Sequence, residues 1–404
     1  MKILLINNTH YIGGGADRVY LNTAELLTSK GHEVMFFSTL DENNYSSENT
    51  GSFVDKTDFR SANFIEKIKG SKNYLYNKEV GSKLNELIQE FKPDLAHLHL
   101  FYGNLTSSVL KTLKRNKTPI VHTVHDYRLL CPANAFLDAK NNICEKCKPK
   151  KYYKCTTNKC SSNNLFFSSI LSMEGYIRKY VIDPLTYINH FVFVSDFSKR
   201  KHISFDSRFE EKSSHAYNFT KLLPKSESNK GDYFLYFGRL SKEKGVTTLL
   251  SAIENTNLKL KIAGTGPLEL SLKNDFESDS VEFLGHKSSN ELKNIISNAS
   301  YIIVPSEWYE NNPMTIIESY SHGKPVIGAR IGGIPEIIID NETGFLFESR
   351  NSIELKNVLI KANALSNQEY DELSINARDF AENNFSAEAN YKHLEEVYLK
   401  LITT

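Results

Sequence analysis

The chain has 404 residues, more than a single hydrophobic core usually supports, so at least two domains are expected. Forty per cent of the residues are hydrophobic, which excludes a disordered chain. The 49 basic and 48 acidic residues leave a net charge of +1, so nucleic acid is not an expected partner.

The first apolar run, residues 3–6, is followed by Asn7 and Asn8. It is too short for a signal peptide and is better explained as a buried strand. The sequence has no stretch of about 18 apolar residues, so no transmembrane helix is expected. These features predict a cytoplasmic protein.

Short apolar runs that end in small or polar residues recur in both halves of the chain, with helix-period segments between them. In the first half they span Ile3–Asn7, Glu33–Ser38, Leu95–His99, Ile120–Asp126 and Phe191–Asp196. In the second half they span Tyr233–Arg239, Leu258–Gly264, Val281–Gly285, Tyr301–Ser306, Val326–Ala329 and Phe345–Phe347. Near-continuous apolar runs are typical of strands buried on both faces. Their alternation with helices predicts an α/β fold with doubly wound parallel sheets.

The alternation is interrupted by the polar segment 224–232, where we place the domain boundary. The first predicted domain spans residues 1–220 and includes a cysteine- and lysine-rich insert at 131–160, and the second spans residues 230–385. The segment 386–404 is predicted to be an amphipathic helix that packs back on the first domain. Its apolar face consists of Tyr391, Leu394, Val397, Tyr398 and Leu401. Doubly wound sheets bind ligands at the carboxyl ends of their strands, so the site is expected there, in a cleft between the domains.

The first candidate loop is Gly13-Gly14-Gly15, which follows the first strand and opens the first helix. Glycines let the backbone approach a ligand, and a helix N-terminus offers unpaired N–H groups to a phosphate. A glycine run serves equally as a tight turn, and no G-x-G-x-x-G is present, so both explanations stay open.

Two basic residues follow the first strand of the second half. Arg239 lies at the strand end and Lys244 in the loop after it, where a guanidinium and an ammonium group suit a phosphate. A solvated basic loop is the alternative, because Glu243 lies between Lys242 and Lys244. The position at a strand end favours ligand binding.

The segment 307–318 carries two carboxylates, Glu310 in a loop and Glu318 inside the following helix, with Pro313 expected in the first turn of that helix. Carboxylates accept hydrogen bonds from sugar and ribose hydroxyls. One alternative is a charge that complements the helix dipole together with a surface glutamate. Another is the carboxylate pair of a glycosidase, but a hydrolase has no use for the phosphate-directed glycines, arginine and lysine.

Five motifs follow one another in the second half of the chain. They are Gly238-Arg239 with Lys244-Gly245, Gly264-Thr265-Gly266-Pro267, the pair Glu310 and Glu318, Gly323-Lys324-Pro325-Val326-Ile327 and Gly332-Gly333-Ile334-Pro335-Glu336. In this order and spacing they resemble family 4 of the retaining glycosyltransferases, of the type that builds surface and capsular polysaccharides. That family has the GT-B fold, in which two Rossmann-like doubly wound domains face each other across a cleft. The resemblance covers nearly the whole chain.

The resemblance implies a role for each matching residue. Arg239 and Lys244 would bind the donor diphosphate, Glu318 the ribose and Glu310 the donor sugar. Gly14 and Gly15 would close over the phosphates from the first domain. The donor-binding set is completed by Gly264, Gly266, Asn312, Pro313 and Met314.

His125, at the end of the fourth predicted strand, resembles the family's histidine near the donor sugar. A lone strand histidine is more often structural, and His122 shows that such histidines are not rare here. With Glu310, Arg239 and Lys244 it completes the implied catalytic set. The family's mechanism retains configuration without a clear protein nucleophile, and its leaving group is stabilised electrostatically. The sequence has no Asp-x-Asp motif, so no catalytic cofactor or divalent ion is expected.

All five cysteines lie between Cys131 and Cys160. Cys144, Cys147, Cys155 and Cys160 form two pairs, with Cys131 as a spare. In a reducing cytosol such clustering favours metal ligation, and four thiolates suit a tetrahedral structural zinc. The spacing is shorter than in common zinc ribbons, so free thiols and disulfides stay open.

The insert is also strongly basic. Six lysines stand against the single acid Glu145, with Tyr152 and Tyr153 among them and an apolar stretch downstream at 165–171. The lysines are Lys146, Lys148, Lys150, Lys151, Lys154 and Lys159. The resemblance implies that the first domain binds the acceptor, and a lobe of this kind in that domain predicts contact with anionic lipid or a lipid-diphosphate carrier at the inner face of the membrane. A solvated loop beside an ordinary core helix is the alternative.

The sequence thus predicts a retaining hexosyltransferase that moves a sugar from a nucleotide sugar, with a UDP-sugar as the expected donor. The expected acceptor is a lipid-linked saccharide in bacterial polysaccharide or glycan assembly. One rival is a sugar-phosphate synthase or a phosphorylase of the same fold, the latter with pyridoxal phosphate on a lysine. The other is a non-catalytic nucleotide-binding or zinc-dependent interaction protein. The intact set of Arg239, Lys244, Glu310 and Glu318 argues against lost catalysis.

Overall fold

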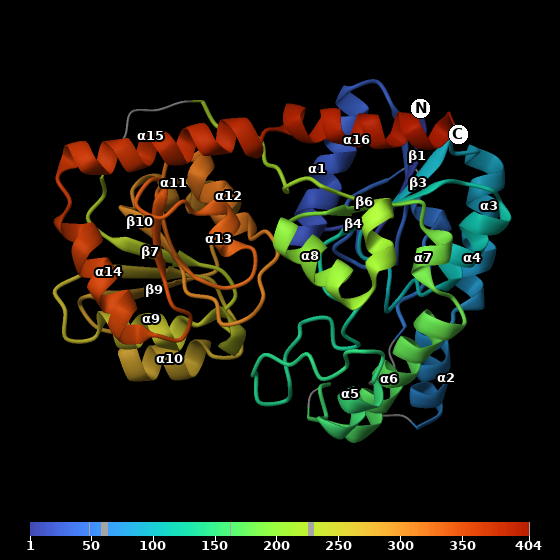
Figure 1. Ribbon diagram of the computed structural model, residues 1–404, viewed down its shortest axis with the longest axis horizontal. Helices are drawn as coiled ribbons and strands as arrows, with labels where there is room; N and C mark the ends of the chain where they lie inside the picture. Colours follow the sequence, from blue (N-terminus) through green and yellow to red (C-terminus); the bar gives the residue numbers. More distant parts are fainter. Residues whose placement is uncertain (48, 58–63, 162, 225–229, 404) are drawn as a thin grey trace. The chain divides into compact units, whose positions relative to one another are not determined.

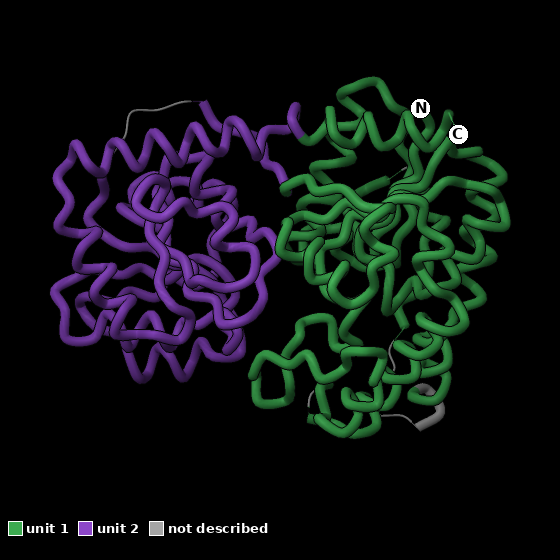
Figure 2. Tube along the Cα trace, in the orientation of Figure 1, with its two compact units in different colours: residues 1–217, 390–404 green, residues 218–389 purple. Residues whose placement is uncertain are grey.

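The computed structural model describes residues 1–47, 49–57, 64–161, 163–224 and 230–403 (Figure 1). The chain forms two compact units, residues 1–217 with 390–404 and residues 218–389 (Figure 2). The polar segment 224–232 lies within the span of the second unit, and its residues 225–229 lie outside the described part of the chain.

The first unit is built on a six-stranded parallel sheet in the order β2-β1-β3-β4-β5-β6. Its strands are β1 (Lys2–Ile6), β2 (Glu33–Phe37), β3 (Leu95–Leu98), β4 (Ile120–Val124), β5 (His190–Phe193) and β6 (Ser213–His215). In β1, Leu4 lies opposite Met35 of β2 and Ala96 of β3. Strand order reverses beside β1, the position at which doubly wound sheets bind ligands.

The longer helices of this unit are amphipathic and bury their apolar faces. In α1, Val19, Tyr20, Ala24 and Leu27 lie at helical spacing and are buried. The helical elements of the unit are α1 (Gly15–Ser29), η1 (Thr50–Ser52), α2 (Phe64–Leu75), α3 (Lys78–Phe91), α4 (Ser108–Arg115), α5 (Tyr153–Thr157), α6 (Leu165–Tyr180), α7 (Pro184–Tyr187), α8 (Asp196–Phe205), η2 (Ser207–Lys212) and α16 (Ala387–Ile402).

The second unit holds a six-stranded parallel sheet in the order β12-β11-β10-β7-β8-β9, the order of dinucleotide-binding sheets. Its strands are β7 (Phe234–Phe237), β8 (Leu260–Ala263), β9 (Val281–Gly285), β10 (Tyr301–Val304), β11 (Val326–Ala329) and β12 (Gly344–Phe347). Its helical elements are η3 (Lys242–Lys244), α9 (Val246–Ile253), α10 (Glu269–Phe276), α11 (Ser289–Ser297), α12 (Met314–Ser321), α13 (Ile334–Ile337), α14 (Ser352–Ala364) and α15 (Asn367–Asn384). The α/β, doubly wound prediction is confirmed for both units.

The C-terminal helix α16 contributes residues 390–402 to the first unit. Tyr398 is fully buried, and its hydroxyl lies 2.6 Å from Nδ1 of His97 in β3. Tyr391 is also buried, with its hydroxyl 2.9 Å from Nε2 of His32. The predicted apolar face of this helix therefore completes the core of the first unit.

Candidate active site

The carboxyl edge of the second sheet brings two of the predicted residues into contact. Since β7 and β10 are neighbours, the loop that carries Lys244 lies beside the loop that carries Glu310. Lys244 Nζ lies 2.7 Å from Glu310 Oε1, and Ser306 Oγ donates a hydrogen bond to the same oxygen at 2.8 Å. The Glu310 side chain is 8% exposed and that of Lys244 is 27% exposed, so the cation faces solvent more than the anion does.

Glu310 is a carboxylate in this setting. Burial raises the pKa of Glu310, but the charge of Lys244 and the hydrogen bonds from Lys244 and Ser306 outweigh burial and hold the pKa below its ordinary value. The contact with Lys244 is therefore an ion pair that holds Glu310 in its charged form.

Sequence reasoning missed Trp308, which lies against this pair. Lys244 Nζ is 5.0 Å from the centre of the Trp308 ring, within the range of a cation–π interaction. The neighbouring Glu307 accepts a hydrogen bond from Thr248 Oγ1 at 2.6 Å and lies 3.3 Å from Arg350 Nε. The signal in the sequence is that the single tryptophan of the chain lies just after a strand, two residues before Glu310.

Arg239 and Glu318 belong to segments that follow the neighbouring strands β7 and β10. Arg239 lies two residues after β7 and is exposed, and its carbonyl oxygen accepts a hydrogen bond from Tyr236 at 2.7 Å. Glu318 is half-buried on α12. The exposed guanidinium of Arg239 is thus available to an anion from solvent.

The predicted glycines Gly264 and Gly266 have a structural explanation. Gly264 has a φ of +140°, and a Cβ there would lie 1.9 Å from the carbonyl oxygen of Gly238. At Gly266 a Cβ would lie 2.4 Å from the carbonyl oxygen of Leu240. Neither position has room for a side chain, so these glycines let the loops after β7 and β8 pack together.

The residues that lead into α12 are held by the start of the second unit. Asn312 is buried, its Oδ1 accepts a hydrogen bond from the Asn218 backbone N–H at 2.7 Å, and its carbonyl oxygen accepts one from Asn218 Nδ2 at 3.0 Å. Pro313 precedes the helix instead of lying in its first turn, and the helix begins at Met314. The prediction was wrong by one residue because Pro313 has extended backbone, with a ψ of 121°.

The remaining predicted residues belong to the first unit. Gly14 is the extended N-cap residue of α1, and it and Gly15 are exposed. His125 directly follows β4 and is half-buried, with Nε2 2.9 Å from Nδ1 of His99. Burial lowers the pKa of His125 to about 3, so the ring is neutral at physiological pH.

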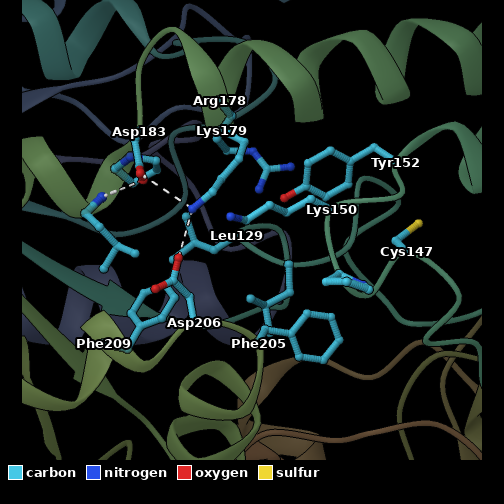
Figure 3. Close-up of a pocket in the computed structure, with 14 residues that line it drawn as sticks. Leu129, Cys147, Lys150, Tyr152, Arg178, Lys179, Asp183, Phe205, Asp206 and Phe209 are labelled. Carbon is cyan, nitrogen blue, oxygen red and sulfur yellow. Dashed lines mark hydrogen bonds and ion pairs between the residues drawn. The ribbon is translucent and has the colours of Figure 1, made fainter.

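The first unit also holds a pocket that the sequence did not predict (Figure 3). It lies between the insert, the end of α6, the start of α7 and the end of α8. Lys179 Nζ joins these segments, at 2.8 Å from Asp206 Oδ2 and 3.6 Å from Asp183 Oδ2. The cavity measures about 40 Å³, room for roughly three water molecules.

The cysteines gather in the insert as free thiols. Cys147 and Cys155 belong to a small buried cluster with Tyr152, and Cys160 packs against it. Burial, reinforced by the neighbouring thiols, raises the pKa of Cys147 to about 12. Within the described part of the chain, no three histidine, cysteine or acidic side chains are arranged so that they could hold a metal ion. Structural zinc stays a prediction, which metal analysis of the purified protein tests.

Comparison with known families assigns each unit. Residues 13–207 match the model Glycosyltransferase Family 4, and residues 218–380 match the model Glycosyl transferases group 1. Only residues 1–12, 208–217 and 381–404 lie outside the two matches. The chain belongs to the glycosyltransferases with these two domains. The predicted family is thereby confirmed.

Several curated relatives of this glycosyltransferase are similar over different shares of the chain. An uncharacterised glycosyltransferase of Methanocaldococcus jannaschii is 32% identical over 179 residues, 43% of this chain and 50% of the relative, so the match spans half of that protein. An uncharacterised 42.6 kDa protein in the cps region of Klebsiella pneumoniae is 26% identical over 357 residues, 83% of this chain and 87% of the relative. The amylovoran biosynthesis glycosyltransferase AmsK of Erwinia amylovora is 28% identical over 184 residues, 41% of this chain and 44% of the relative.

Solved structures support the fold of this glycosyltransferase. HepE of Anabaena, in complex with UDP and glucose, has a TM-score of 0.69 at 18% identity and covers 99% of this chain and 100% of its own. Sucrose-phosphate synthase from Thermosynechococcus elongatus has a TM-score of 0.70 at 17% identity, and the match covers 100% of this chain and 99% of the synthase chain. These likenesses confirm the GT-B fold. No helix among the described residues is long and apolar enough to cross a lipid bilayer.

Proposed function

We propose that this glycosyltransferase moves a sugar, with retention of configuration, from a UDP-sugar to a lipid-linked saccharide during assembly of a bacterial polysaccharide. Support for the pathway comes from the relatives, one in a cps region and one assigned to amylovoran biosynthesis. Support for the donor comes from HepE, whose complex contains UDP and glucose.

The observation that carries the donor site is the Lys244–Glu310 ion pair beside the exposed Arg239. In the proposal the donor diphosphate binds Lys244 and Arg239, because an ammonium and a guanidinium are the groups that neutralise phosphate oxygens. Glu318 takes the ribose hydroxyls. Glu310, released from Lys244, accepts a hydrogen bond from a hydroxyl of the donor sugar.

The proposed transfer breaks the bond between the sugar C1 and the diphosphate oxygen, and the electron pair leaves with the diphosphate. The acceptor hydroxyl oxygen forms the new bond to C1 on the same face, and its proton passes to the departing phosphate oxygen. Lys244 and Arg239 stabilise the charge that develops on the leaving group, so electrostatic stabilisation is the main contribution of the chain.

The insert supplies the proposed contact with the inner face of the membrane. α5, in the insert, packs against α6, and α6 exposes Leu165, Phe166 and Met173. Exposed apolar side chains next to a row of lysines suit an anionic lipid surface. Changing Lys148, Lys150 and Lys151 together to Glu is expected to abolish sedimentation with vesicles that contain anionic lipid. Unchanged sedimentation and unchanged activity on a lipid acceptor would refute this contact.

The test of the donor site is a thermal-shift screen against UDP, GDP, ADP and their common sugar conjugates. A ligand that binds only the folded state raises Tm by mass action. We expect a shift with the uridine series that Arg239→Ala and Glu318→Ala remove. Lys259→Ala and Glu282→Ala carry matched charge changes at exposed positions and should keep the shift.

The outcomes separate the rivals. If only guanosine or adenosine nucleotides raise Tm, the donor is a GDP-sugar or an ADP-sugar instead of a UDP-sugar, and the proposed donor site is kept. No shift with any nucleotide, from folded protein, would reject the donor site and favour a non-catalytic interaction protein. An absorbance band of pyridoxal phosphate would instead identify a phosphorylase.

A further inference from the structure

Two histidines meet at neighbouring strand ends in the first unit. β3 and β4 pair in parallel, with Leu98 opposite His122, so His99 and His125 both lie at the carboxyl edge of the sheet. His99 Nδ1 is 2.9 Å from His125 Nε2, and the ring planes are 18° apart with centres separated by 5.1 Å. This geometry is a hydrogen bond between two imidazole rings.

A single proton lies between these two nitrogens, because both rings are neutral. Burial lowers the pKa of His99 well below its ordinary value, and the neighbouring His97, His125 and His122 lower it further. The pKa of His125 is also lowered by burial. A neutral imidazole has one N–H donor and one bare acceptor nitrogen. Either His99 donates and the proton of His125 is on Nδ1, or His125 donates and the proton of His99 is on Nε2.

The surroundings of His99 favour the first arrangement. His99 is 1% exposed, and its Nε2 has no hydrogen-bond partner among the described residues. If His125 donated, that Nε2 would carry a buried N–H without an acceptor, which folded proteins avoid. If His99 donates, its Nε2 carries only a lone pair and no N–H of the ring is left without a partner.

The rings of His97 and Tyr20 hold the ring of His99 in place. His97, on the same face of β3, bonds the Tyr398 hydroxyl at 2.6 Å and Thr123 Oγ1 at 2.7 Å. Its ring centre is 4.6 Å from that of His99, and the Tyr20 ring contacts His99 at 5.5 Å. His99 therefore has a fixed orientation from which to donate.

We propose that His99 is a positioning residue: it donates from Nδ1 to His125 and fixes His125 as the tautomer that carries its proton on Nδ1. The catalytic consequence rests on the proposed function. A neutral His125 in one fixed tautomer presents the same hydrogen-bonding pattern throughout the pH range near neutrality, which suits contact with a polar group of a sugar.

Nitrogen NMR of the protein labelled with ¹⁵N-histidine tests the tautomer directly, since ring nitrogen shifts separate an N–H from a bare nitrogen. The His125 signals are assigned by their loss in His125→Gln. We expect the proton on Nδ1 in the unaltered protein and in His99→Asn, whose amide nitrogen takes the place of Nδ1 and donates. Asp only accepts, so His99→Asp should move the proton of His125 to Nε2.

A proton on Nε2 of His125 in the unaltered protein, or an unchanged tautomer in folded His99→Asp, overturns the proposal. If His99→Asp does not fold, the spectrum of the unaltered protein decides alone. This readout needs no activity, so it separates a failure of the His99 assignment from a failure of the proposed transfer.

Kinetics provide the second readout. His99→Asn should keep kcat within about threefold, whereas His99→Leu should lower kcat by roughly tenfold to a hundredfold with little change in the donor KM. His190→Gln, at the other end of the neighbouring strand β5, is the control and should match the unaltered protein. Equal losses in His99→Asn and His99→Leu would assign His99 a packing role only.

Discussion

The amine of Lys244 is already paired with a carboxylate, at 2.7 Å from Glu310. A diphosphate that binds Lys244 therefore competes with Glu310 for the same positive charge. In the proposed donor site, a diphosphate that takes that charge leaves Glu310 with the hydrogen bond from Ser306 and with capacity for a sugar hydroxyl. Under this proposal, binding of the leaving group and release of Glu310 from Lys244 are one event.

The Lys244–Glu310 ion pair predicts that substitution of Glu310 has opposite effects on UDP binding and on sugar transfer. Glu310→Gln removes the competing charge, so the affinity for free UDP should rise severalfold, while transfer should fall at least about tenfold because the sugar loses its carboxylate. Calorimetric titration and initial rates measure the two effects. Glu307→Gln, whose side chain pairs with Arg350, is the control. Weaker UDP binding in Glu310→Gln would contradict the competition.

Gly264 directly follows β8, and its backbone lies so close to Gly238 that no other residue fits there. A Cβ would lie 1.9 Å from the Gly238 carbonyl oxygen, and the φ of +140° strains any other residue. Gly264→Ala should lower the free energy of unfolding by at least about 2 kcal/mol. Gly51→Ala, where a Cβ meets nothing within 4 Å, should change it by less than about 0.5 kcal/mol. Urea unfolding of both variants measures the difference.

Among the elements of the first unit, β3, β4 and α8 bury neutral histidines. Burial lowers the pKa of His97, His122 and His202 to about 3, with neighbouring histidines contributing in the two strands. The unfolded chain has the ordinary value of about 6.5 and binds more protons between pH 3 and 6.5. The stabilisation is therefore complete above pH 6.5 and is lost as the pH falls toward 3.

Stability should accordingly decline between pH 6.5 and 5, before most carboxylates titrate. Each histidine contributes a slope of up to about 1.4 kcal/mol per pH unit. His202→Asn keeps a donor to the Ser198 carbonyl oxygen, which His202 Nδ1 bonds at 2.8 Å, and should flatten the slope by about one proton. Unfolding midpoints from pH 8 to 5 measure this, and equal slopes in the two proteins would contradict it.

The elements that the sequence predicts are those with apolar runs. Each of the eleven predicted strands coincides with a strand of the structure, because burial on both faces demands continuous hydrophobicity. β6 escaped prediction because Ser213-Ser214-His215 contains no apolar residue. The sequence also did not predict the contacts Lys244–Glu310 and His99–His125. They depend on which strands become neighbours and on side-chain directions, and residue spacing specifies neither.

At the scale of the whole molecule, the second unit carries Arg239, Lys244 and Glu318, which are proposed to bind the diphosphate and the ribose. UDP should therefore slow hydrogen exchange in peptides covering 238–245 and 306–318, and leave the peptide at 178–185, beside the small pocket of the first unit, unchanged. Mass spectrometry of exchanged protein measures both. Protection confined to the first unit would contradict the donor assignment.

The return of residues 390–404 to the first unit has a consequence for synthesis on the ribosome. Tyr398 bonds His97, which lies 301 positions earlier. Translation of residues 218–389 separates the two, and at about 5–20 residues per second this takes roughly 10–30 s. The second unit is continuous in sequence, so it can fold as soon as it leaves the ribosome. The sheet of the first unit is made earlier, but its contact surface for α16 stays uncovered until α16 is synthesised. A chaperone that recognises exposed apolar chain thus has its longest access to the half of the enzyme that is made first and finished last.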